Sequence, residues 1–172
     1  MNEVIKAIKE RRSVKSYKPD AVPAELLDAI LEAGTYAPTG RNAQAPIIIA
    51  VTDKKVRDRL SKLNAEVMGF DGDPFYGAPA VLVVLADKSR STYLYDGSLV
   101  MENLMLAAHS LGLGSCWIHR AKEVFELKEG KEILASLGIE GEYEGIGNCI
   151  IGYAENSPSE RKPRKEKYVY KI

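Results

Sequence analysis

The sequence has few of the residues from which metal and redox-active sites are usually built. Its 172 residues include two cysteines, two histidines and one tryptophan. Cys116 and Cys149 lie in apolar segments, which is typical of buried reduced thiols rather than of a disulfide framework. His109 falls inside a long helical pattern, where a packed or surface histidine is expected. No His/Cys/Asp cluster has metal-ligand spacing and no Gly-x-Ser-x-Gly turn occurs, so the sequence predicts no metal site and a difficult reaction would need a bound cofactor.

An excess of one charge and a long apolar run are also missing. The 24 Lys and Arg residues balance 24 Asp and Glu residues, so the formal net charge is zero. This balance supplies no overall field for a nucleic-acid backbone or an anionic membrane. No apolar run approaches the roughly 20 residues of a spanning helix, and the start at Met1 shows no secretory leader. We therefore expect a cytoplasmic protein that binds a small molecule and has neither nucleic acid nor membrane as a partner.

Helical and strand patterns alternate along the chain, whose length fits one domain with its own core. Apolar residues at helical spacing predict helices near residues 4–8, 23–34, 56–67, 96–111 and 124–137. Short apolar runs predict buried strands at 47–51, 80–86, 115–119 and 145–153. Gly34 and Gly112 are expected to end helices, and Asp96 or Ser98 to cap the long one.

The end of the chain has the composition of a tail rather than of a core. From Ala154 onward the sequence is polar, with prolines among the charged residues. Its last residues nevertheless have the pattern of an edge strand, in Tyr168, Val169, Tyr170 and Ile172. A strand of this kind has to pair with a neighbour.

Three separate patches could bind an anionic, planar ligand. At the end of the first helix, Arg11, Ser13 and Lys15 alternate, so an extended backbone would point them to one side, as a phosphate requires. The stretch from Thr35 to Pro46 is a loop with exposed backbone donors, in which Gly40 permits close approach and Asn42 and Gln44 offer donors and acceptors. The third patch is Lys162 to Arg164. Taken singly, the two charged patches are more typical of solvated surface, and the loop could equally be a mere connection.

Taken in order, these motifs resemble those of the nitroreductase family over essentially the whole chain. The family has an RRSxR-like turn, a Pro-Ser-x-x-Asn-x-Gln loop, a fyGAP stretch, a helical Asn followed by LGLGSxW, and a closing IGY followed by Lys-x-Arg. Here these are Arg11–Lys15, Pro38–Gln44, Phe75–Pro79, Asn103 with Leu111–Trp117, and Ile151–Tyr153 with Lys162 and Arg164. The chain departs from the family's Gln-Pro-Trp at Gln44–Ile47, and Asn64 is the one candidate for an Asn that longer relatives place before the second buried strand.

The resemblance implies an α+β fold, a three-layer-like sandwich of a mixed, mostly antiparallel sheet flanked by helices. It also implies an obligate homodimer of one domain, residues 1–172, whose tail, residues 154–172, is exchanged with the partner subunit. FMN, bound tightly but non-covalently between the subunits, would carry the chemistry in place of a catalytic side chain. NAD(P)H would reduce it at N5, and a small-molecule acceptor such as a nitroaromatic or a quinone would then oxidise it in a ping-pong mechanism.

The resemblance further assigns residues to parts of the cofactor. Lys15 would lie beside N1 and O2, where its charge stabilises reduced flavin. Backbone atoms of Trp117, Ile118 and His119 would face N5 and O4. Arg11, Lys162 and Arg164 would hold the phosphate, and Ser13 would meet the ribityl or phosphate region. The other subunit would contribute Pro38, Thr39, Gly40 and Asn42. Arg12 and Gln44 are further cofactor-binding candidates in the same two motifs.

Other functions stay open at the level of sequence. A flavin-processing or dehalogenating reductase of the same superfamily would share the cofactor site, and so would an FMN-binding protein without turnover. A flavodoxin-type electron carrier fits less well, because its phosphate loop follows a first strand whereas this sequence opens with a predicted helix.

Overall fold

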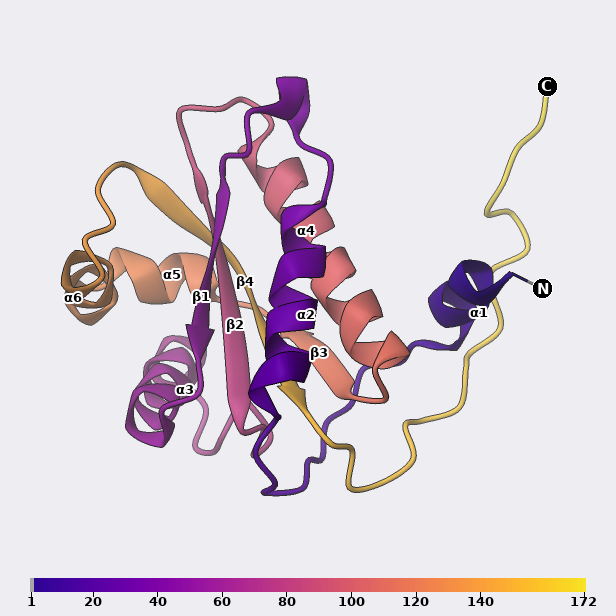
Figure 1. Ribbon diagram of the computed structural model, residues 1–172, viewed down its shortest axis with the longest axis horizontal. Helices are drawn as coiled ribbons and strands as arrows, with labels where there is room; N and C mark the ends of the chain where they lie inside the picture. Colours follow the sequence, from indigo (N-terminus) through magenta and orange to yellow (C-terminus); the bar gives the residue numbers. More distant parts are fainter. Residues whose placement is uncertain (1) are drawn as a thin grey trace.

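A four-stranded antiparallel sheet forms the centre of the structure, a computed structural model that describes residues 2–172 (Figure 1). The strands lie in the order β1-β2-β4-β3, and all three strand pairings are antiparallel. They are β1 (Pro46–Val51), β2 (Ala80–Asp87), β3 (Gly114–Ile118) and β4 (Tyr143–Gly152). Each predicted apolar run forms a strand, and β2 is buried along almost its whole length because helices cover both faces of the sheet.

Helices pack on the two faces of the sheet and give the predicted three layers (Figure 1). On one face lie α2 (Ala24–Thr35) and α4 (Tyr93–Ser110), which share a core with Leu82 and Val84. On the other face, α3 (Lys54–Met68) and α5 (Ala121–Glu126) share a core with Val81 and Val83, and α6 (Lys128–Ser136) packs beside α5. Successive β2 side chains thus alternate between the two cores, as the period of a strand requires.

Two helix ends differ from the sequence prediction. The long helix α4 begins at Tyr93 after Thr92, so Asp96 and Ser98 lie inside it and the prediction that one of them caps it was wrong. Gly34 lies within α2 rather than after it. Glycine suits this position because a Cβ atom there would lie 2.7 Å from Leu104 Cδ2. Gly112 does end α4, in a left-handed conformation with φ of 78°. The helix predicted for residues 124–137 is two helices, α5 and α6, separated at extended Leu127.

The first helix and the tail stand apart from the helix-sheet body (Figure 1). In α1 (Glu3–Glu10), the apolar side chains of Val4 and Ile8 are 64% and 51% exposed. In the tail, Tyr168 and Tyr170 are 66% and 79% exposed, and the predicted edge strand does not form within one chain. Both segments therefore carry apolar surface that the chain itself leaves uncovered. No helix within residues 2–172 combines the length and the apolar character needed to cross a membrane.

The pairing of β2 with β4 contains a bulge close to the start of α5. Val84 pairs with Gly147 and Leu85 with Gly145, so Ile146 is the extra residue of β4. A Cβ atom on Gly145 would lie 2.3 Å from the carbonyl carbon of Ala121, the first residue of α5. Only glycine allows this approach, which also fixes the short segment that joins β3 to α5.

Gly145→Ala should destabilise the protein more than Gly69→Ala. Gly69 is left-handed with open space around its Cβ, so alanine there should cost about 1 kcal/mol of conformational energy. At Gly145 the added methyl meets backbone atoms that cannot move independently, which places its effect toward the upper end of about 1–3 kcal/mol for overpacking. Urea unfolding of both variants measures the difference, and equal losses would show that α5 can shift away from β4.

Candidate functional site

The basic turn after α1 runs in extended conformation beside β3. Ser13 forms a parallel bridge with Ser115, and the Val14 amide donates to the Ser115 carbonyl at 3.0 Å. Val14 is buried, whereas Ser13 and Lys15 are exposed. Ser13 and Lys15 therefore face away from the core, as the alternation predicted, whereas the Arg11 side chain is only 23% exposed.

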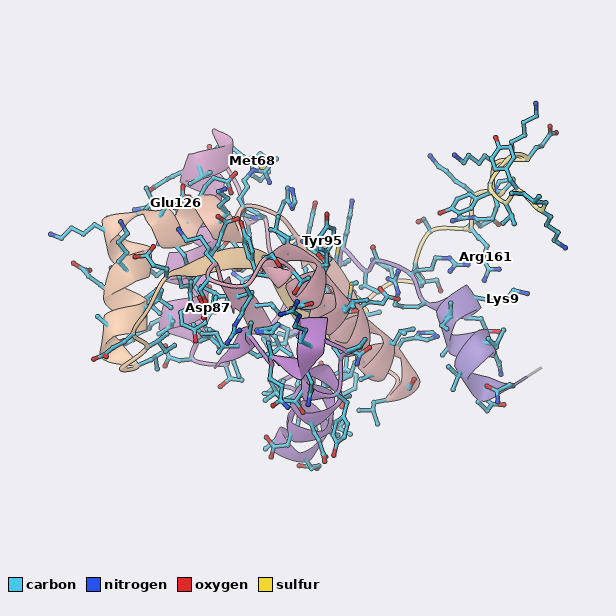
Figure 2. All side chains as sticks on the ribbon, turned by 90° about the horizontal axis from the view of Figure 1, so that it is seen from above. Lys9, Met68, Asp87, Tyr95, Glu126 and Arg161 are labelled. Atoms are coloured by element: carbon cyan, nitrogen blue, oxygen red, sulfur yellow. The ribbon has the colours of Figure 1, made fainter. Side chains whose placement is uncertain are left out.

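Cations from both ends of the chain gather in a groove of about 520 Å³ between the end of α1 and the tail. Figure 2 shows Lys9 and Arg161 close together at this end of the molecule, where the guanidinium groups of Arg161 and Arg12 both donate to the Lys9 carbonyl. Desolvation and the nearby charges of Arg161, Arg164 and Arg11 lower the pKa of Arg12. The lining cations are Lys9, Arg11, Arg12, Arg161, Lys162 and Arg164, with Glu160 among them.

This groove unites the first and third sequence patches and adds Arg161 to them. Arg161 was missed because it belongs to a charged tail whose position relative to α1 is set only by folding. Its one sequence signal is its place next to Lys162. Such a concentration of positive charge favours an anionic ligand.

Arg11 has hydrogen-bond donors that the protein leaves unused. Its side chain is 23% exposed, and its Nε lies 3.8 Å from Oε1 of Glu102 in α4, too far for a hydrogen bond. Within residues 2–172, the buried Nε and Nη1 atoms have no hydrogen-bond partner. A buried donor left unsatisfied costs about 1–3 kcal/mol. Donors without a partner suit the oxygens of a phosphate, and Arg11 lines the groove together with the other cations.

Two buried amides hold the main chain at the end of β3. Asn64, in α3, donates from Nδ2 to the His119 carbonyl at 2.8 Å. Asn148, in β4, donates from Nδ2 to the carbonyls of Ile118 and His119, each at 3.3 Å. Arg120, the next residue, has a left-handed φ of 73°. Asn64 is fully buried and holds the backbone instead of reaching the surface, and Asn148 was not identified from the sequence.

The loop of the second patch is strained. Arg41, Asn42 and Gln44 have φ values of 54°, 54° and 51°, a region that costs a non-glycine residue about 1–2 kcal/mol. The Gln44 amide donates to Thr39 Oγ1 at 3.0 Å. Pro38, Asn42 and Gln44 remain exposed. Strain of this kind clusters at functional sites, which supports a binding role for the loop over a merely connecting one.

A buried carboxylate fixes this loop to α4. Asp96 is 3% exposed and accepts hydrogen bonds from the Gly40 amide at 3.0 Å and from Thr92 Oγ1 at 2.9 Å. A Cβ atom on Gly40 would lie 2.4 Å from Thr92 Oγ1, so this position requires glycine. Asp96 therefore positions the loop instead of capping the helix.

Within one chain the loop and the basic groove are separate. In Figure 1 the loop and its short 3-10 helix η1 (Gly40–Asn42) lie at one end of α4, whereas α1 and the tail stand off its side. Thr39 and Gln44 line a different hollow of about 540 Å³, between α2 and β1. The structure thus brings Arg11, Arg12, Lys162 and Arg164 together but does not bring Pro38–Gln44 to them.

Comparison with known proteins identifies nitroreductases and flavin reductases as relatives. A sequence model of the Nitroreductase family matches residues 8–153. A putative NADH dehydrogenase/NAD(P)H nitroreductase from Archaeoglobus fulgidus is 34% identical over 98% of this chain and 91% of its own length. An NAD(P)H FMN reductase from Bacillus subtilis is 30% identical over 100% of this chain and 64% of its own length. Other curated relatives are likewise longer, and this chain spans 60% of two of them.

The fold has close counterparts among solved structures. A crystal structure of a nitroreductase with bound FMN from Bacteroides fragilis is similar to this chain with a TM-score of 0.89. The two chains are 30% identical, and the match covers 100% of each.

Replacing Asp96 by Asn should loosen the strained loop. Asparagine keeps one acceptor oxygen and puts an NH2 donor in place of the other, so one of the two hydrogen bonds is lost and the free energy of unfolding should fall by about 1–3 kcal/mol. Amide hydrogen exchange of residues 39–44 should accelerate. The matched control is Asp53→Asn, because Asp53 caps α3 at an exposed position and Asn caps equally well. Unchanged exchange in the loop of the Asp96 variant would contradict the positioning role.

Proposed function

Because this chain belongs to the nitroreductase family, we propose that it is an FMN-dependent oxidoreductase that uses NAD(P)H to reduce a small electron acceptor. Nitroaromatics and quinones are the proposed acceptors. The observation that carries the proposal is the pair of buried, unused donors of Arg11 in a groove lined by cations.

The groove would hold the phosphate end of FMN. Arg11 contributes its unused Nε and Nη1, and the tail contributes Lys162 and Arg164 from the opposite wall. Arg12 adds charge at the same end, and Ser13 is exposed next to it. Charge-assisted hydrogen bonds to phosphate are roughly twice as strong as neutral ones, so this end would supply much of the affinity.

The ring end would lie against Lys15 and the end of β3. When bound, FMN would supply the redox chemistry: it accepts a hydride from NAD(P)H and then passes the electrons to the acceptor, which enters after the oxidised nucleotide has left. Lys15 would supply a positive charge to stabilise the negative charge that reduced flavin carries near N1 and O2. The backbone from Trp117 to His119, held by the buried amides of Asn64 and Asn148, would face N5 and O4.

We also propose that the active form is a homodimer of single-domain subunits. One chain offers the basic groove and the loop at separate places, so a second copy of the loop, with Pro38, Thr39, Gly40, Asn42 and Gln44, would complete each site. The strand β1 has one edge that no other strand of the sheet pairs with, and the tail, residues 154–172, ends in exposed apolar residues. Exchange of the tail would cover this apolar surface.

The first test is reduction of the purified protein by NAD(P)H without oxygen. The protein should show the blue absorption band of flavin, which bleaches on addition of NADH or NADPH and returns on addition of a quinone or nitroaromatic. A yellow protein that neither nucleotide bleaches would be a flavin-binding protein without this activity. A colourless protein that does not bind added FMN would contradict the proposal itself.

Arg11→Ala should weaken FMN binding. Loss of charge-assisted hydrogen bonds worth about 1.5–3 kcal/mol corresponds to a dissociation constant about 10- to 150-fold higher. Quenching of FMN fluorescence measures this constant. The control is Arg59→Ala on α3, whose exposed side chain pairs with Glu132 at 3.3 Å. An unchanged affinity in the Arg11 variant would remove Arg11 from the phosphate site.

Lys15→Gln should make the bound flavin harder to reduce. Removing a cation that favours the reduced form by about 1.4 kcal/mol lowers a two-electron midpoint potential by about 30 mV. Equilibration with a reference dye under anaerobic conditions gives the potential. A value equal to that of the wild type would show that Lys15 lies too far from the ring to act on it.

A further inference from the structure

The fyGAP stretch, Phe75–Pro79, is built on an ion pair between buried Arg57 and half-buried Asp73. Asp73 accepts hydrogen bonds from the backbone amides of Phe75 at 2.9 Å and Gly77 at 2.7 Å. Arg57, which is 8% exposed, pairs with the Asp73 carboxylate and also donates from Nε to the Ala78 carbonyl at 3.0 Å. The two side chains together therefore fix the backbone on both sides of Tyr76.

Asp73 keeps its charge in this setting. Burial opposes ionisation, but hydrogen bonds from Arg57 and Ser61 and from the two backbone amides lower the pKa of Asp73 overall. The adjoining ring of Phe75 is fully buried and lies under the Arg57 guanidinium, 5.6 Å from ring centroid to Cζ. The segment is thus anchored by a charged network and by an apolar side chain.

The result of this anchoring is a strained but exposed tyrosine. Tyr76 has a φ of 53° and Gly77 a φ of 74°, so two consecutive residues are left-handed. This conformation suits glycine but costs tyrosine about 1–2 kcal/mol. Tyr76 is nevertheless 40% exposed, so the strain does not serve to bury its ring. Backbone strain of this kind indicates that the position of the Tyr76 side chain has a function.

The ring of Tyr76 faces Lys15. The Lys15 Nζ lies 5.8 Å from the ring centroid, within the roughly 6 Å range of a cation–π contact. Lys15 forms no ion pair within the described part of the chain. An aromatic face attracts the ammonium group without neutralising it, whereas a carboxylate would cancel its charge. The cation is thus restrained and still available to an electron-rich ligand.

We infer that Tyr76 is a positioning residue that holds the Lys15 ammonium in place for the electron-rich edge of the flavin. This inference rests on the proposed function for the identity of the ligand. The contact between Tyr76 and Lys15, however, is a property of the protein alone. The inference therefore predicts one result that can be measured without flavin and a second that requires bound flavin.

The first experiment is NMR of the full chain freed of flavin, with lysine labelled at the ε carbon. The Lys15 ε protons should be shifted upfield by the ring of Tyr76, and Lys15→Gln assigns their signal. Tyr76→Leu should return the signal to the position of an exposed lysine, whereas Tyr76→Phe should leave it shifted. A Lys15 signal that Tyr76→Leu does not move would overturn the inference, whether or not the protein binds FMN.

The second experiment is a double-mutant cycle on the midpoint potential of the FMN-loaded protein. Tyr76→Leu should lower the potential in the same direction as Lys15→Gln but by less, and Tyr76→Phe should keep the wild-type value. In the Lys15→Gln background, Tyr76→Leu should have no further effect, because its action passes through the lysine. Equal shifts in both backgrounds would show that Tyr76 acts independently and would overturn the positioning role.

Phe70→Leu is the matched control for both experiments. Phe70 is a 47% exposed aromatic residue from the same connection between α3 and β2. Phe70→Leu should leave the Lys15 signal and the midpoint potential of the bound FMN unchanged. If Phe70→Leu moves both as much as Tyr76→Leu does, the effect comes from the loop as a whole and the specific role of Tyr76 is wrong.

Discussion

Positive charge that the chain does not neutralise is the constraint on which the site depends. The protein has no net charge, yet six cationic side chains from the two ends of the chain line one groove. Desolvation and then the repulsion of neighbouring arginines lower the pKa of Arg12, and two buried donors of Arg11 have no hydrogen-bond partner among the described residues. Such a concentration of like charge favours the binding of an anion.

Buried and half-buried polar side chains serve a second common purpose, which is to hold three of the chain's connections. Asp96 fixes the loop before β1, Asp73 with Arg57 fixes the stretch before β2, and the amides of Asn64 and Asn148 fix the backbone after β3. Each connection contains a non-glycine residue in the left-handed region. A bound cofactor can supply reactivity only if the protein supplies fixed geometry, which these buried groups provide.

The chain also leaves apolar surface and one of the candidate binding loops without a neighbour. The apolar face of α1 and the aromatic end of the tail are left open by the chain itself, and the loop stands apart from the groove. A second copy would cover the apolar surface and supply the missing loop together. Binding of the ligand and association of subunits would then depend on the same contacts.

The sequence by itself determined the elements whose signals are local. Apolar runs predicted the four strands, the alternation after Arg11 predicted that Ser13 and Lys15 face outward, and the order of motifs predicted the family and the α+β fold. Only the tertiary structure decided that α4 begins before Asp96, that Gly34 lies inside α2, that Arg161 joins the groove, and that Asn148 holds the backbone of His119. The physical reason is the same in each case. These features depend on contacts between residues far apart in the chain, whose effects no local periodicity or propensity records.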